Sequence, residues 1–250
     1  MKLVYKGHPP VQIDKGKFTV LATNNRKTYF ELIRGLQGFN DRLTILDDDY
    51  QDLDPEKAID WDGDLVANNN LATIYSTEIV KSIIKNLTEE DRHLLDAEAR
   101  RLYSNVQEIL FMTDLPLEVR YDGDIKRLLN YCKIKFSPLV QQSPYDIIKT
   151  DLKLHLECAD SSCVGLSNVA NYLDSAQFNE LQQLNIELKI PVLLIEFTEI
   201  DNRRYYGNAN FYYIDRDFVD WEHQPRQSKC EGQIDWQSRA SRRILFRCQR

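Results

Sequence analysis

The sequence lacks a cysteine pattern that could cross-link the chain or bind a metal. The five cysteines are odd in number and include no C-x-x-C pair: Cys132, Cys158, Cys163, Cys230 and Cys248. A disulfide framework is not expected, and a zinc site is not expected because only His155 lies close in sequence to Cys158 and Cys163. Free thiols of this kind are typical of a reducing cytoplasm.

A long apolar run and a targeting pattern are also missing. The longest purely apolar run spans residues 191–195, whereas a transmembrane helix needs about 20 residues. Residues 1–20 lack the basic-then-apolar order of a signal peptide. From the sequence we therefore expect a cytoplasmic protein without a membrane partner.

Basic residues are outnumbered, because 32 Lys and Arg face 39 Asp and Glu and the net charge is -7. A protein that coats DNA contacts phosphates through Lys and Arg, so the total charge argues against that class. The distribution of charge matters more than the sum, since a basic groove can lie within an acidic exterior. The composition therefore leaves DNA binding open.

The first 46 residues predict an α/β pattern. Short strands are expected at 3–6, 11–13 and 18–22, where glycine and proline separate the runs. A helix is expected at 28–36, where apolar residues recur every three positions, and a strand follows at 43–46. This order of elements favours an α/β fold.

The middle of the chain predicts helices. Residues 71–112 contain no glycine or proline, and apolar residues repeat there at helical spacing. We expect two long helices with a break near Asn86, the second capped by the Thr88 hydroxyl. Two shorter helices are expected at 124–131 and 145–156.

The α/β signal returns in the last third of the chain. Residues 164–172 are strand-like, and a helix with Asp174 as its N-cap follows. Residues 190–197 form an apolar run typical of a strand buried on both faces, and a last strand is expected at 211–214. A β–α–β unit of this kind implies parallel neighbouring strands.

Helices that interrupt an α/β pattern suggest an inserted subdomain. We predict a discontinuous α/β head domain at 1–67 and 158–220 and an α-helical leg subdomain at 68–157. Two long antiparallel helices would project from the head domain and form an arm, and such arms tend to pack on another subunit. Residues 221–250 are basic and aperiodic, which predicts a flexible tail that either touches DNA or has no role.

One segment resembles a phosphate-binding loop in its position. Residues 21–28 lie between a predicted strand and a predicted helix and end in Lys27 and Thr28, as such loops do. Leu21 and Arg26 stand where the two glycines are needed, and without glycine the backbone cannot easily wrap round a phosphate. The sequence therefore predicts a P-loop topology that has lost its nucleotide, with Arg26 and Lys27 exposed in an ordinary turn.

Acidic residues precede the helix predicted at 124–131. The carboxylates of Glu118, Asp122 and Asp124 could bind calcium, which accepts six to eight oxygen ligands. An EF-hand would need a glutamate at its twelfth position, which is missing, and helix capping by the same carboxylates is the alternative. The acidic run 47–49 predicts a solvated turn.

The order of segments along residues 1–220 resembles the Csn-two family of subtype II-A CRISPR systems. The segments that carry the resemblance are HPPVQIDKGKFTVL (8–21), RLTIL (42–46), the acidic run 118–124, IKRLLNYCKIKF (125–136), LSNVANYLD (166–174), PVLLIE (191–196) and FYYID (211–215). The residues beyond Trp221 have no counterpart in it.

The resemblance implies a head related to P-loop ATPases, a helical leg, and a homotetrameric ring that surrounds linear double-stranded DNA without being an enzyme. It implies a role in spacer acquisition beside the CRISPR integrase proteins and the RNA-guided nuclease. Carried over by position, Glu118, Asp122 and Asp124 become calcium ligands. On the head, the candidates for phosphate contacts are Lys15, Lys17, Arg26, Lys27 and Arg34.

Two other functions remain as alternatives. The clustered carboxylates could hold a metal for a nuclease, or the loop at 26–28 could still use ATP. The absent glycines and the four histidines, with no G-x-S-x-G motif, argue against an enzyme. A scaffold that binds only proteins through its helical arm would have no affinity for DNA.

Overall fold

The computed structural model describes residues 1–67, 71, 75–136, 143–158 and 162–223. A six-stranded sheet forms its centre, in the order β10-β9-β3-β8-β7-β6. Its strands are β3 (Phe18–Thr23), β6 (Ile59–Gly63), β7 (Cys163–Ser167), β8 (Val192–Phe197), β9 (Asn210–Ile214) and β10 (Asp220–His223). Within the described residues, no helix combines the length and apolar character needed to cross a membrane.

Five neighbouring strands of this sheet run parallel. β3 pairs in parallel with β8 and β9, and β7 pairs in parallel with β8 and β6, while β10 is antiparallel to β9. The β–α–β unit predicted at 164–197 is confirmed, because Val164 of β7 lies in register with Val192 of β8. All residues from 192 to 196 are buried, as expected of a strand covered on both faces.

A second, antiparallel sheet follows the order β2-β1-β4-β5. It is built from β1 (Lys2–Tyr5), β2 (Val11–Gln12), β4 (Leu43–Leu46) and β5 (Asp52–Leu53). α1 (Arg26–Leu36) lies between β3 and β4 in sequence, so the predicted order β–β–β–α–β is confirmed. The short helix α2 (Pro55–Ala58) leads into β6.

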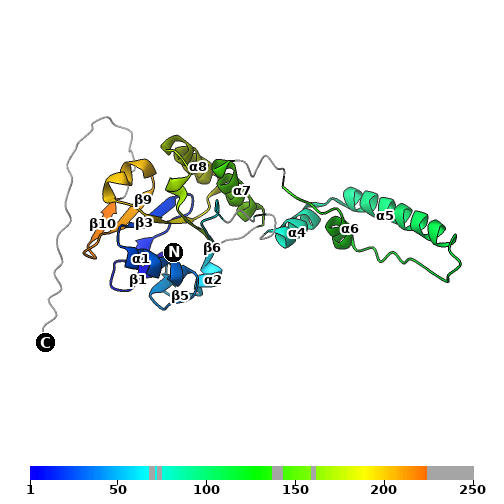
Figure 1. Ribbon diagram of the computed structural model, residues 1–250, viewed down its shortest axis with the longest axis horizontal. Helices are drawn as coiled ribbons and strands as arrows, with labels where there is room; N and C mark the ends of the chain where they lie inside the picture. Colours follow the sequence, from blue (N-terminus) through cyan, green and yellow to red (C-terminus); the bar gives the residue numbers. More distant parts are fainter. Residues whose placement is uncertain (68–70, 72–74, 137–142, 159–161, 224–250) are drawn as a thin grey trace.

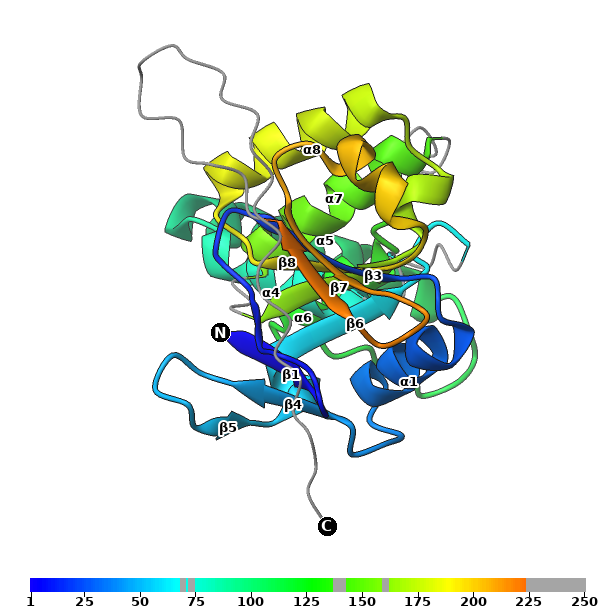
Figure 2. The ribbon, with the colours of Figure 1, turned by 90° about the vertical axis from the view of Figure 1, so that its left-hand side faces the viewer.

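The two faces of the central sheet bury separate cores, because strand side chains alternate between faces. Phe18 and Val20 of β3 face α7 (Pro144–Glu157) and α8 (Ser175–Leu188). Leu21 of β3 faces α1 and the antiparallel sheet. Figure 2 shows this layering, with α7 and α8 on one side of the sheet and α1, β1 and β4 on the other.

Within the described residues between β6 and β7, the chain includes α4, α5, α6 and α7. α4 (Ser76–Asn86), α5 (Glu89–Leu110) and α6 (Ile125–Tyr131) extend away from the sheet in Figure 1, and α6 contacts both α4 and α5. α7 packs against α8 instead, and its Ile148 and Leu152 belong to the sheet's core. The predicted caps of these regions are confirmed, since Thr88 and Asp174 each form a capping box.

The structure corrects three secondary-structure predictions. β6 was not predicted, although it forms an edge of the central sheet. The strand expected at 164–172 ends at Ser167, because Asn168 is left-handed (φ 61°) and starts a 3-10 helix, η2 (Val169–Asn171). β10 overlaps the start of the predicted flexible tail, where it gains backbone hydrogen bonds from β9, and residues 224–250 lie outside the described residues.

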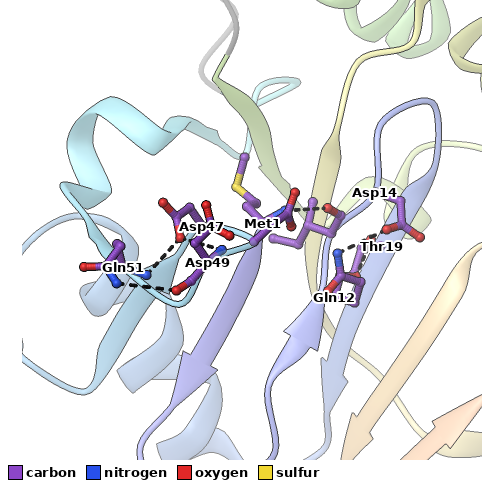
Figure 3. Close-up of polar contacts among 9 residues, drawn as sticks. Met1, Gln12, Asp14, Thr19, Asp47, Asp49 and Gln51 are labelled. Atoms are coloured by element: carbon purple, nitrogen blue, oxygen red, sulfur yellow. Dashed lines mark hydrogen bonds and ion pairs between the residues drawn. The ribbon is translucent and has the colours of Figure 1, made fainter.

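The antiparallel sheet joins the central sheet through short polar contacts (Figure 3). The hydroxyl of Thr19 on β3 donates to the Gln12 carbonyl at 3.3 Å, and the Gln12 side chain donates to Asp14 at 3.2 Å. The predicted turn at 47–49 is confirmed, because one Asp47 oxygen accepts from the backbone N–H groups of Asp49 and Gln51 at 2.9 and 2.8 Å.

Gly165 in β7 provides a test of this packing. A Cβ atom there would lie 2.7 Å from Trp61 Cε3 and 2.9 Å from Ile59 Cγ2. Gly165→Ala should therefore lower the free energy of unfolding by about 1–3 kcal/mol, measured by urea denaturation. If the Trp61 ring is the obstacle, combining the change with Trp61→Ala should cost less than the sum of the two single changes. Strict additivity would contradict the assigned contact.

Candidate functional site

The carboxyl ends of the parallel strands meet at one edge of the central sheet. Ligands of open α/β sheets bind at such an edge, so it is the first place to look for a site. The segments that leave β3, β8, β7 and β9 there begin at Asn24, Thr198, Asn168 and Asp215.

The connection between β3 and α1 occupies the position of a phosphate-binding loop but is closed by its own side chain. It consists of Asn24 and Asn25 only. Asn25 is the N-cap of α1, and its side-chain oxygen accepts from the backbone N–H groups of Lys27 and Thr28 at 3.0 and 3.3 Å. In a phosphate-binding loop such amides face the phosphate. No residue from 21 to 28 has a positive φ angle, so the backbone does not form a nest for an anion.

A buried carboxylate lies at the end of β8. Glu196 is 3% exposed, and its Oε1 accepts from the N–H groups of Val169 and Ala170 at 2.9 and 3.4 Å. Burial raises the pKa of Glu196 to about 7, while these two hydrogen bonds lower it and the Asp64 carboxylate raises it again. Glu196 therefore anchors η2 to the sheet.

Asp64, directly after β6, extends this network across the edge. Its Oδ2 accepts from the Asn168 side chain at 3.0 Å and from the Tyr172 hydroxyl at 3.1 Å. The Tyr29 hydroxyl of α1 donates to Asn168 Oδ1 at 3.0 Å. Burial, followed by the charge of Glu196, raises the pKa of Tyr29, so its hydroxyl remains a donor at neutral pH. The edge is thus tied together internally by α1, β6, η2 and β8.

The five predicted phosphate contacts do not form one patch. Arg26 and Lys27 are exposed at the carboxyl end of β3, whereas Lys15 and Lys17 precede its other end, about 20 Å away for a strand of this length. Lys17 pairs with Asp14 at 3.2 Å. Arg34, near the end of α1, is half-buried and its guanidinium lies 3.7 Å from the centre of the Phe39 ring.

The predicted calcium ligands lie beside a cation that the protein itself supplies. Arg127 forms ion pairs with both Asp122 and Asp124. Asp124 also caps α6, accepting from the Lys126 N–H at 2.9 Å, and Glu118 pairs with Arg120 at 3.3 Å. Within the described part of the chain, no three His, Cys, Asp or Glu side chains converge as a metal site would require. The donor types suit calcium, but in this conformation Arg127 holds the place that the ion would need.

Two groups of buried acids were missed by the sequence analysis. Glu196 ends an apolar run, and an acid in that position was the signal that could have identified it. Asp151 is fully buried on α7, four residues after Ile147 and three after Ile148, so it lies on the apolar stripe of the helix. An acid on such a stripe is a recognisable exception to amphipathic patterning.

The role of Glu196 can be tested by truncation. Glu196→Ala should lower the free energy of unfolding by about 1–3 kcal/mol, because the N–H groups of Val169 and Ala170 lose their acceptor. Glu196→Gln keeps an acceptor and should restore most of the loss. Glu187→Ala, on the exposed side of α8, is the control and should stay within about 0.5 kcal/mol. Equal effects of Glu196→Ala and Glu187→Ala in urea denaturation would refute the anchoring role.

No protein-family model and no curated protein matches the chain. Solved structures do match: Stu0660 of Streptococcus thermophilus is 12% identical with a TM-score of 0.50, over 85% of this chain and 74% of that chain. A nucleotide-free ATP-binding cassette from an ABC transporter is 12% identical with a TM-score of 0.47, over 90% of this chain and 92% of that chain. At such identity the likeness to Stu0660 shows the fold alone. The chain is therefore a mixed α/β protein with a parallel sheet.

Proposed function

We propose that this chain belongs to the Csn-two family and binds linear double-stranded DNA without sequence preference, as a homotetrameric ring that supports CRISPR spacer acquisition. One structural observation carries the proposal: the loop between β3 and α1, at the carboxyl edge of the parallel sheet where a phosphate would bind, has amides that Asn25 already caps. Such a loop fits a P-loop relative whose role no longer depends on a bound nucleotide. The DNA, the ring and the CRISPR partners in this proposal rest on the resemblance of the sequence segments, in their order, to the Csn-two family.

The exposed cations at the carboxyl edge support a DNA role for the head. Among the described residues, neither Arg26 nor Lys27 forms an ion pair. Their charges are therefore available to phosphate oxygens, which a sequence-independent binder contacts in preference to bases. Lys17 and Arg34, which already have partners, would contribute less unless those contacts change on binding.

The helices α4, α5 and α6 support assembly of several copies. Ala99 is the one α5 residue that is buried, although the helix has 22 residues. Large apolar side chains are exposed on it and just after it: Leu94, Leu102, Ile109, Phe111 and Met112. Such exposure is unusual for a monomer and is typical of a surface that another chain covers. We propose that these helices form the leg of the 68–157 subdomain and that a second copy packs on this face.

DNA binding should be strong at low salt and weaken steeply as salt is added, because bound counterions are released from the phosphates. The measurement is fluorescence anisotropy with a labelled linear duplex and unlabelled competitors. Arg26→Ala combined with Lys27→Ala should weaken binding to all sequences alike. Each lost phosphate contact should reduce the slope of log K against log salt by about 0.9. The control is Lys57→Ala with Lys153→Ala, which removes the same charge from exposed sites on α2 and α7.

Several outcomes would redirect the proposal. A closed circle that competes as well as linear duplex would exclude threading through a ring, and a lone subunit in sedimentation at binding concentrations would exclude the ring itself. Absence of binding at low salt would favour the protein-only scaffold. Turnover of DNA or ATP by the purified chain would favour an enzyme.

Calcium should stabilise the assembly if Glu118, Asp122 and Asp124 bind it, which is the part of the proposal that depends on the resemblance. Since Arg127 competes for the same carboxylates, Arg127→Ala should tighten calcium binding in titration calorimetry, and Asp122→Asn should weaken it. At a calcium concentration of about 100 times the dissociation constant, the added stability should be about 2.7 kcal/mol. Melting and sedimentation that do not change on chelation, for the natural chain and for Arg127→Ala alike, would remove calcium from the proposal.

A further inference from the structure

A second group of acids lies where β6, α7 and the start of α4 meet. Asp60 and Asp62 project from β6, and Asp151 projects from α7. The Tyr75 hydroxyl, at the N-cap of α4, donates to Asp151 Oδ1 at 3.0 Å and lies 3.4 Å from Asp60 Oδ2. This junction cluster, defined as Asp60, Asp62, Tyr75, Asp151 and His155, joins the sheet edge to α7 and to the start of α4.

Of the acids of the junction cluster, Asp151 is fully buried, whereas Asp60 and Asp62 are partly exposed. Asp151 has no exposed surface, and among the residues that the structure describes neither its Oδ2 nor the Oδ2 of Asp62, both shielded from solvent, has a hydrogen-bond partner. Within the described residues, no lysine or arginine pairs with Asp62 or Asp151. A buried carboxylate without a cation is costly, and the usual solution is that the group holds a proton.

His155, the remaining residue of the junction cluster, lies near Asp60. His155 on α7 is buried, its Nε2–H donates to the Ser162 carbonyl at 3.0 Å, and its Nδ1 lies 3.8 Å from Asp60 Oδ2. Tyr75 therefore contacts both Asp151 and Asp60, and His155 lies near Asp60, whereas Asp62 Oδ2 has no hydrogen-bond partner among the described residues.

Burial and the repulsion between neighbouring carboxylates both raise the pKa values of Asp62 and Asp151. Burial, followed by the charges of Asp151 and Asp60, raises the pKa of Asp62 to about 8, while His155 lowers it. Burial likewise raises the pKa of Asp151, while the hydrogen bond from Tyr75 lowers it. Because the two acids interact, the first proton to leave belongs to the pair and not to one residue.

We propose that a proton held by the carboxyl groups of Asp62 and Asp151 keeps α7 and the start of α4 packed against β6, and that loss of this proton loosens the junction. Two carboxylates whose Oδ2 atoms are shielded from solvent would then be charged together where α4 and α7 meet β6. The orientation of the helices that follow α4 would respond to pH, whether or not the chain binds DNA.

The direction of the pH effect follows from linkage. The folded chain holds its proton to a higher pH than the unfolded chain, in which an aspartic acid has a pKa of about 3.9. The stabilisation is therefore complete in acid below that value and is lost as the pH rises through about 8. A carboxyl group with a lowered pKa would show the opposite trend.

Hydrogen exchange measured between pH 6 and pH 9.5, after correction for the intrinsic pH dependence, tests the proposal. In the natural chain, protection of the α4 and α7 amides should fall relative to α8 as the pH rises. In Asp62→Asn, which cannot carry the second charge, this relative loss should disappear. Glu196→Gln is the matched control, because it removes the other buried acid with a raised pKa at a different edge and should leave the loss in place.

Infrared difference spectra give an independent readout. A protonated-carboxyl band should persist at pH 7 in the natural chain, decrease through about pH 8, and be reduced in Asp62→Asn. Asp151→Asn serves as a second variant if Asp62→Asn does not fold. Absence of the band at pH 7, or an unchanged α4 and α7 response in both folded variants, would overturn the proposal. So would a calcium- or magnesium-induced gain in protection that Asp62→Asn abolishes at pH 7, because a cation would then neutralise the acids.

Discussion

The parallel pairing of β3 between β8 and β9 is the constraint on which the rest of the structure depends. It buries β3 on both faces, so the chain must cover one face with α7 and α8 and the other with α1 and the antiparallel sheet. It also brings the ends of several strands to one edge, where Glu196 and Asp64 organise the connecting segments. The polar edge is thus a consequence of the direction in which the strands run.

The local charge of the surface depends more on which charged side chains are buried than on the net charge of the chain. In the part of the chain that the structure describes, no lysine or arginine forms an ion pair with Asp62, Asp64, Asp151 or Glu196. Exposed cations such as Arg26 and Lys27 face solvent at the same edge as Glu196. A net charge of -7 is therefore compatible with a local surface for phosphates, because part of the negative charge is buried and can be held as neutral acid.

Arg127 illustrates how one side chain can decide between two interpretations of a motif. The run from Glu118 to Asp124 offers oxygen ligands, and in sequence it is equally suited to calcium and to helix capping. In the structure Asp124 caps α6 and shares Arg127 with Asp122. Capping is therefore observed, and a calcium ion would have to compete with an intramolecular ion pair.

The sequence by itself determined the α/β class, most element positions, the capped starts at Thr88 and Asp174, and the loss of glycine from the loop at 21–28, because periodicity, caps and turns are local properties. It did not reveal β6, whose acidic residues contradict the pattern of a buried strand until Tyr75 and α7 are placed beside it. It could not separate Lys15 and Lys17 from Arg26 and Lys27, or bring Asp62 to Asp151, since those distances depend on how strands and helices pack. Only the tertiary structure decided which acids are shielded from solvent, because burial arises between segments that are distant along the chain.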